Sequence, residues 1–326
     1  MLQIRNLKTH FFTRGGVAAA VDDVSIRIPP RSIVGVVGES GCGKSVTALS
    51  VLQLVSRPGK IVSGSILLDG EELIGKPSKQ MRRIRGNKIS MIFQEPMTSL
   101  NPVYTVGRQV AETMILHRGA SKAEAMDRTV EMFRAVGIPA PEKRLKSFPH
   151  QLSGGLRQRV MIAMAMACKP SLMIADEPTT ALDVTIEAQI LHLMKELERD
   201  MGTSIMMITH NMGVVAELCD YVYVMYAGKV MEHAGIFDLF DHTKHPYTQG
   251  LLNSIPKPSG VRGRLFNIEG MVPSLLRLPK GCRFSPRCEQ AVRECFESEP
   301  GLYAVSPGHG VRCFLYRDCG DGGEAI

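Results

Sequence analysis

The glycine-rich segment 38–45 constrains the fold of this chain most. It has the sequence Gly-Glu-Ser-Gly-Cys-Gly-Lys-Ser, follows the apolar run 32–37 and precedes a helical pattern over 44–54. The spacing Gly-x4-Gly-Lys-Ser is that of a P-loop, in which backbone N–H groups turn inward around phosphates at a helix N-terminus. Strand, loop and helix therefore predict an α/β core with a nucleotide phosphate site. A glycine-rich surface turn is the alternative, and only the later motifs exclude it.

Three side chains of the P-loop have separate predicted tasks. Lys44 reaches the β- and γ-phosphate oxygens, and the Ser45 hydroxyl is a ligand of Mg²⁺. Cys42 lies among inward-facing N–H groups, beside Lys44 and near a helix N-terminus, and all of these favour the thiolate. We therefore expect a maleimide to inactivate the protein through Cys42 and bound Mg-nucleotide to protect it; the alternative is that Cys42 only occupies a position that tolerates small residues.

Two carboxylates follow the apolar strand pattern at 172–175. Asp176 stands where a carboxylate can hold Mg²⁺ through its water shell, and Glu177 is free to polarise an attacking water. General-base catalysis contributes roughly 10²- to 10⁴-fold in rate, so loss of Glu177 should reduce turnover most without preventing binding. A buried strand that ends in Asp-Glu by coincidence is the alternative, and the P-loop argues against it.

The sequence Leu-Ser-Gly-Gly at 152–155 opens another helix. Ser153 is a predicted N-cap, and the two glycines permit close backbone approach. Within one subunit this helix N-terminus meets no anion, because the P-loop already encloses the phosphates. We therefore expect it to cover the γ-phosphate of a neighbouring subunit; a capped helix after a loop is the alternative.

Composition and charge restrict the class of protein. The 326 residues are 44% hydrophobic, and the formal net charge is +7. No apolar segment of a secretory signal follows Met1, and the longest apolar run, 160–168, is too short for a membrane span of about 20 residues. We expect a cytosolic chain whose membrane role comes through a partner. The scattered positive charge favours a solvated basic face near a membrane over a nucleic-acid patch.

Short β-branched runs alternate with helical patterns, which predicts an α/β fold with a mainly parallel core sheet. The predicted strands are 4–9, 24–28, 32–37, 65–68, 89–93, 172–175, 204–208 and 221–226. The first two and 65–68 are expected to form an antiparallel β subdomain, because short turns link them. Residues 105–135 predict a helical insertion without strands.

The same patterns predict two domains. Residues 1–254 are expected to form a nucleotide-binding domain, with a helical subdomain at about 97–165. Residues 255–326 are expected to form a linker and a small Cys-rich C-terminal segment. A segment of that size buries little core and needs a staple.

At this point the chain resembles the nucleotide-binding subunit of an ABC transporter, which implies a P-loop NTPase fold of the ABC ATPase type. More narrowly, it is similar to the ATPases of the dipeptide/oligopeptide/nickel importer family. That match rests on Phe-Gln-Glu-Pro-Met-Thr-Ser-Leu-Asn-Pro at 93–102, on His-Pro-Tyr-Thr at 245–248 and on Gly-Cys-Arg-Phe-Ser-Pro-Arg-Cys at 281–288. The resemblance covers nearly the whole chain.

The resemblance implies roles that spacing alone does not assign. Gln94 would contact Mg²⁺ and link the site to the helical insertion, His210 would contact the γ-phosphate, and Asp183 would cross a dimer interface. Phe11 would stack on adenine, with Phe12 as the adjacent alternative. The implied ATP-binding set is Phe11, Gly38, Glu39, Ser40, Gly41, Cys42, Gly43, Lys44, Ser45 and Val46. The implied catalytic residues are Glu177, His210 and Gln94, and the implied Mg²⁺ ligands are Ser45, Gln94 and Asp176. The implied signature and interface set is Ser153, Gly154, Gly155, Gln158 and Asp183.

Cysteines gather near the C-terminus of the chain. Four of them lack the paired C-x2-C spacing typical of structural zinc, whereas iron–sulfur clusters accept varied spacings. These four are Cys282, Cys288, Cys295 and Cys313. Some peptide-importer ATPases with this tail carry a [4Fe-4S] cluster, so the resemblance implies a cluster that staples the tail here. Zinc and unliganded thiols are the alternatives; Cys319 falls outside the pattern, and His309 is a conceivable substitute ligand.

The resemblance implies an ATPase that powers import of di- and oligopeptides through an inner-membrane permease. Its implied partners are a second ATPase subunit, identical or a sister chain, two permease subunits and a solute-binding protein, and its implied place is the cytoplasmic face of the membrane. Import of nickel, glutathione or another small solute stays open, because the binding protein and the permease select the substrate. The alternative of a different class is an ABC ATPase acting on nucleic acid or ribosomes. Such proteins commonly carry two nucleotide domains or a long coiled coil, and this chain has neither pattern.

Overall fold

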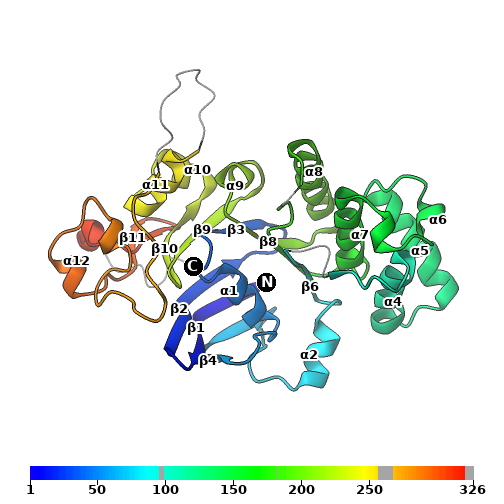
Figure 1. Cartoon of the computed structure of the whole chain (residues 1–326), viewed down its shortest axis with the longest axis horizontal. Coiled ribbons are helices and arrows are strands. Elements are labelled where there is room, and N and C mark those ends of the chain that lie inside the picture. The colour runs from blue at the N-terminus through cyan, green and yellow to red at the C-terminus, as the bar shows by residue number, and fades with distance from the viewer. Residues whose placement is uncertain (95–98, 181, 256–266, 320–326) are drawn as a thin grey trace. The chain divides into compact units, whose positions relative to one another are not determined.

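The computed structural model describes residues 1–94, 99–180, 182–255 and 267–319 (Figure 1). The chain divides into two compact units. The first consists of Met1–Ile28, Ile33–Ile74 and Ile208–Ile326, and the second of Pro29–Ser32 and Gly75–Met207. Part of the predicted motif at 93–102 and most of the predicted linker lie outside the described residues.

An antiparallel sheet forms one part of the first unit. Its strand order is β2-β1-β4-β5, with β1 at Leu2–Thr13, β2 at Gly16–Ile28, β4 at Gly59–Leu68 and β5 at Glu71–Glu72. The central strand β1 pairs with both neighbours, so that Leu2 is opposite Ile28 on one side and Leu68 on the other. All three side chains are buried. The predicted antiparallel arrangement of these strands is confirmed.

A second group of strands in the first unit carries the P-loop. Within this unit its order is β11-β12-β10-β9-β3, and only β3 (Ile33–Val37) and β9 (Tyr221–Tyr226) pair in parallel. Each residue of β3 is buried, which explains its continuous apolar sequence. The other strands are β10 (Lys229–Gly235), β11 (Tyr303–Ser306) and β12 (His309–Val311). None of these three was predicted from the sequence.

Helices of the first unit are short. They are α1 (Lys44–Val51), α9 (Met212–Leu218), α10 (Ile236–Asp241), α11 (Pro246–Asn253) and α12 (Glu294–Glu297). Two 3₁₀ turns, η2 (Ser285–Arg287) and η3 (Phe314–Cys319), lie near the C-terminus. Helix α1 starts at the P-loop lysine, as the sequence predicted.

The second unit joins three strands to longer helices. Strand β6 (Ile89–Ile92) pairs in parallel with β7 (Leu172–Asp176), and β8 (Ser204–Thr209) follows β7 in the sheet order, with its last two residues in the first unit. The helices and one 3₁₀ turn are α2 (Ser78–Ile84), α4 (Val106–Arg118), α5 (Lys122–Ala135), α6 (Pro141–Arg144), η1 (Pro149–Gln151), α7 (Gly154–Met166) and α8 (Val184–Met201). Because α4 and α5 occupy most of 105–135 with no strand between them, the predicted helical insertion is confirmed. In the described ranges, we find no helix with the length and apolar character that a membrane crossing requires.

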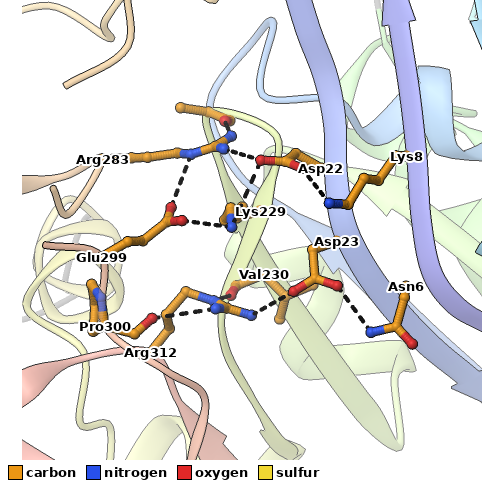
Figure 2. Close-up of polar contacts among 11 residues, drawn as sticks. Asn6, Lys8, Asp22, Asp23, Lys229, Val230, Arg283, Glu299, Pro300 and Arg312 are labelled. Atoms are coloured by element: carbon orange, nitrogen blue, oxygen red, sulfur yellow. Dashed lines mark hydrogen bonds and ion pairs between the residues drawn. The ribbon is translucent and has the colours of Figure 1, made fainter. Parts of the chain in front are cut away.

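The C-terminal segment consists of residues 267–319. Its small size predicted that it needs additional stabilisation, and ion pairs to the rest of the first unit provide it. Arg283 from this segment pairs with Asp22 of β2, and its Nε donates to a carboxylate oxygen of Glu299 at 3.2 Å (Figure 2). Lys229 of β10 donates to the other Glu299 oxygen at 2.8 Å. Burial works to raise the pKa of Asp22, but Lys229 and Arg283 together hold it below its ordinary value. Buried charges are thus paired rather than left without compensation.

A second anchor is the fully buried Glu232 on β10. Its carboxylate lies 2.8 Å from Nε2 of His309 and accepts backbone N–H groups of Lys244 and His245 at 2.8 and 3.0 Å. Burial alone would raise the pKa of Glu232. The hydrogen bonds that the carboxylate accepts have the larger combined effect and hold its pKa below the ordinary value. In the same region β12 pairs with β10, with Arg312 donating to the Val230 carbonyl at 3.1 Å. The C-terminal segment is therefore part of the first unit.

Candidate nucleotide-binding site

The P-loop bends through two positions that only glycine can occupy. Gly38 has φ +148°, and a Cβ there would lie 2.1 Å from the Met225 carbonyl oxygen. Gly43 has φ +107°, and a Cβ there would lie 2.2 Å from the Ala20 carbonyl oxygen. Contacts that short require the backbone to move, so β2 and β9 hold the loop at both ends.

Lys44 is folded back into the P-loop. Its side chain is almost fully buried, and Nζ donates to the carbonyl oxygens of Gly38 at 2.7 Å and Glu39 at 3.0 Å. The ammonium group therefore lies at the start of the loop, against the carbonyl groups of its first two residues. An ammonium can donate three hydrogen bonds, and the third reaches Cys42 Sγ at 3.8 Å, so a phosphate oxygen would have to replace one of these contacts.

Cys42 differs from its prediction. The side chain is fully buried, and its Sγ lies 3.8 Å from Lys44 Nζ. Burial raises the pKa of the Cys42 thiol more than the neighbouring Lys44 lowers it. The expectation of a thiolate is wrong, because residue spacing does not indicate how completely the thiol is removed from water.

Two aromatic side chains were candidates to stack on adenine. Phe11 on β1 pairs with Ala18 of β2 and Gly59 of β4, and its ring edge would be 2.7 Å from a Cβ at Gly59. The Phe12 side chain is 50% exposed, and the Phe11 side chain is less exposed than that. Both rings thus belong to the antiparallel sheet of the first unit.

The second unit brings two predicted catalytic side chains together. Strand β7 is buried along its length and ends at Asp176; Glu177 follows in a left-handed conformation with φ +47°. Gln94, which comes shortly after β6, donates from Nε2 to Glu177 Oε2 at 3.0 Å. Thr180 donates to the same oxygen at 2.9 Å. A positive φ at a non-glycine residue is uncommon and turns this carboxylate away from the direction of the strand.

The helix that follows Leu152 begins as predicted. Ser153 is the N-cap of α7, and its Oγ accepts from the Leu156 backbone N–H at 3.4 Å. A Cβ at Gly155 would lie 2.9 Å from Ile186 of α8, so the start of α7 approaches α8 closely. Gln158 is buried, and Asp183 is the residue before α8. His210 follows β8 and is exposed.

The two units divide the predicted site residues between them. The P-loop, Phe11 and His210 belong to the first unit. Gln94, Asp176, Glu177 and the Ser153–Gly155 turn belong to the second.

Sequence reasoning missed two residues that contact the P-loop. The Glu39 backbone N–H donates to the Tyr247 hydroxyl at 2.9 Å. Arg287 donates to both Glu39 carboxylate oxygens, from Nη1 at 2.6 Å and from Nη2 at 3.0 Å. The hydrogen bonds to Glu39 raise the pKa of Arg287 despite its burial. Both residues lie in motifs that supported the family resemblance, but nothing in those motifs indicates a contact with residue 39.

The iron–sulfur prediction is wrong. Four cysteines line a cavity of about 140 Å³ near Phe284, namely Cys282, Cys288, Cys295 and Cys313. Across the described ranges, however, His, Cys, Asp and Glu side chains form no group of three or more that could hold a metal ion. This geometry gives the zinc alternative no support either. Ion pairs and the pairing of β12 with β10 hold the segment for which a cluster was expected.

Two family models match this chain. Residues 21–180 match the model of the ABC transporter family. Residues 231–295 match the model described as oligopeptide/dipeptide transporter, C-terminal region.

Relatives and solved structures agree with these matches. The chain is 51% identical to a probable peptide ABC transporter ATP-binding protein of Sinorhizobium fredii, over 96% of this chain and 94% of the relative. It is also 51% identical to the oligopeptide transport ATP-binding protein AppD of Bacillus subtilis, over 98% of each chain. A dimeric ATP-binding cassette bound to ADP and Pi is 28% identical, with a TM-score of 0.66 over 72% of this chain and 99% of that chain. The chain therefore belongs to the family of peptide and oligopeptide ABC transporter ATP-binding proteins.

Proposed function

We propose that this chain is the ATP-hydrolysing subunit of an ABC importer, and that ATP hydrolysis drives uptake of di- and oligopeptides across the inner membrane. The observation that carries the proposal is the pairing of Gln94 with Glu177 directly after the buried end of β7. The names of the relatives and the matched C-terminal region support peptides as the transported solute.

The ATP site is assigned to residues 38–46, with Phe11 against the adenine. Lys44 already lies inside the loop, and it would exchange one carbonyl contact for a β- or γ-phosphate oxygen. Mg²⁺ would be held by Ser45, Asp176 and Gln94, whose hydroxyl, carboxylate and amide oxygens suit a hard cation. Bound Mg²⁺ neutralises charge that develops on the phosphates.

Glu177 is the proposed general base. Water attacks the γ-phosphorus, the bond to the ADP oxygen breaks, and the water proton passes to the Glu177 carboxylate. Gln94 and Thr180 both donate to Oε2 of Glu177, and these two hydrogen bonds would orient the carboxylate toward the water. His210 would contact the γ-phosphate.

The remaining assignments concern assembly. Ser153, Gly154, Gly155, Gln158 and Asp183 would meet the nucleotide of a second ATPase subunit, and the Ser153 cap leaves the N-terminus of α7 ready for an anion. We propose that the ATPase pair binds two permease subunits at the cytoplasmic face of the membrane and that a solute-binding protein delivers the peptide. The division into residues 1–254 and 255–326 stays a prediction.

Transport by the native complex tests this function. The complex is isolated through a tag on this chain and reconstituted into liposomes with its binding protein and a labelled peptide. We expect uptake that requires ATP and is abolished by Lys44→Ala. ATP-dependent uptake of nickel or glutathione without uptake of peptide would reject the proposed solute, and full uptake by the Lys44→Ala complex would reject the ATP site.

A further inference from the structure

Glu39, the second residue of the P-loop, is held at each of its polar groups. Its backbone N–H donates to the Tyr247 hydroxyl at 2.9 Å, and its carbonyl accepts from Lys44 Nζ at 3.0 Å. Its carboxylate accepts two parallel hydrogen bonds from Arg287, at 2.6 and 3.0 Å. Bidentate pairing of this kind fixes orientation as well as charge. The first turn of the loop is therefore held from α11 and from η2.

Arg287 is built into its position. Its side chain is 4% exposed, against 28% for Glu39. Beyond the two bonds to Glu39, Nε donates to the Glu269 carbonyl at 3.0 Å, Nη2 to the Ile268 carbonyl at 3.1 Å and Nη1 to the Tyr226 hydroxyl at 3.3 Å. These contacts use all five N–H donors of a guanidinium group. Lysine could not reproduce them, because it lacks the planar fork.

Tyr247 is equally constrained. It is fully buried, and its ring packs against Tyr226 and Phe284 with centroid distances of 4.7 and 5.4 Å. Phe284 belongs to the C-terminal segment and packs edge-on against Tyr226 at 5.3 Å. A loop residue, a strand, a helix and the C-terminal segment thus meet in one packed group within the first unit.

We propose that Arg287 and Tyr247 are positioning residues for ATP: they hold the first turn of the P-loop, and Arg287 neutralises the Glu39 carboxylate beside the phosphate site. The inference rests on the proposed function of the P-loop. Without Arg287 the Glu39 carboxylate keeps an uncompensated negative charge in the loop that surrounds the ATP phosphates. Repulsion between this charge and the phosphates would weaken ATP binding. The C-terminal segment thereby acts on ATP affinity without touching ATP.

The test measures the dissociation constant of ATP on the full-length chain by isothermal titration calorimetry. Arg287→Met is expected to weaken binding by about tenfold, the effect of one uncompensated charge near phosphates at a partly solvated site. Glu39→Gln combined with Arg287→Met removes that charge and should restore the affinity to within about threefold of the wild type. Tyr247→Phe, which removes one hydroxyl only, should weaken binding by about threefold.

Arg312→Met is the matched control, since Arg312 is a buried arginine of the same segment that donates to Val230 and Pro300. It should lower the melting temperature as Arg287→Met does and leave ATP affinity unchanged. Wild-type affinity in Arg287→Met, or no recovery in the double variant, would overturn the inference. The ATP affinity of Lys44→Ala is measured in parallel. Normal ATP binding by Lys44→Ala would reject the proposed function of the P-loop itself. Loss of ATP binding in Lys44→Ala together with wild-type affinity in Arg287→Met would reject only the role of Arg287. If Arg287→Met does not fold, Tyr247→Phe decides, and unchanged affinity in it contradicts the proposal.

Discussion

Replacing Arg283 by methionine should loosen the C-terminal segment. Methionine keeps much of the side-chain length but removes the bonds to Asp22, Glu299 and the Ala227 carbonyl (Figure 2). Removal of one member of a buried ion pair costs about 3–5 kcal/mol when the partner is left without compensation. Here the cost is smaller, because Lys229 remains 3.7 Å from Asp22 and 2.8 Å from Glu299.

We expect a loss of about 2 kcal/mol from the ion pairs. A buried carbonyl without a donor adds about 1 kcal/mol. The total of about 3 kcal/mol corresponds to roughly a hundredfold increase in the local opening constant. Native-state hydrogen exchange measures that opening at the amides of β12 and at Arg312 N–H, which donates to Met231 at 2.7 Å.

The control for this prediction is Arg293→Met. Arg293 is 93% exposed and, among the residues that the structure describes, pairs only with Glu297 one helical turn on, so its loss should change opening by less than about 0.5 kcal/mol. Equal exchange at β12 in the wild type and in both variants would show that the buried ion pairs do not hold the C-terminal segment.

Two further predictions follow from burial. Burial lowers the pKa of His233 and of His245 to about 4 in the folded chain, so both residues take up protons on unfolding below about pH 6.5. The stability that they contribute is therefore present above about pH 6.5 and is lost as the pH falls toward 4. The free energy of unfolding should fall by about 1.4 kcal/mol per pH unit for each residue. Thermal unfolding from pH 7 to 5 measures this slope, and His245→Asn, which can still accept the Tyr247 N–H, should reduce it; an unchanged slope in that variant would contradict the assignment. The buried Cys42 thiol should react with a maleimide much more slowly in the folded chain than the exposed Cys319, as mass spectrometry after brief labelling would show, and equal rates would contradict its burial.

Much of the fold was predictable from local pattern. The eight predicted strands all occur, because β-branched apolar runs between glycine and aspartate are a local signal. The N-cap at Ser153 and the helix start at Lys44 were likewise readable from the sequence. Strands β5, β10, β11 and β12 were missed. Of these, β5 and β12 are very short, and β12 is placed by its pairing with β10 rather than by its own pattern.

The candidate site was predictable only as far as its motifs extend. The Gln94–Glu177 contact joins residues 83 positions apart, and the family resemblance supplied Gln94 where spacing did not. The Arg287–Glu39 pair spans 248 positions and carries no motif of its own, so only the folded chain reveals it. Cysteine spacing misled because it says nothing of how the side chains are arranged or of what else holds the tail.

In the proposed reaction, Glu177 takes the proton of the attacking water. Glu177→Gln keeps the size of the side chain but removes the base, so the variant should bind Mg-ATP as the wild type does. Its single-turnover rate of phosphate release should fall by roughly 10²- to 10⁴-fold. It should also accumulate as an ATP-bound dimer, visible by size-exclusion chromatography only when Mg-ATP is present. A single-turnover rate near that of the wild type, with ATP binding intact, would show that Glu177 is not the general base.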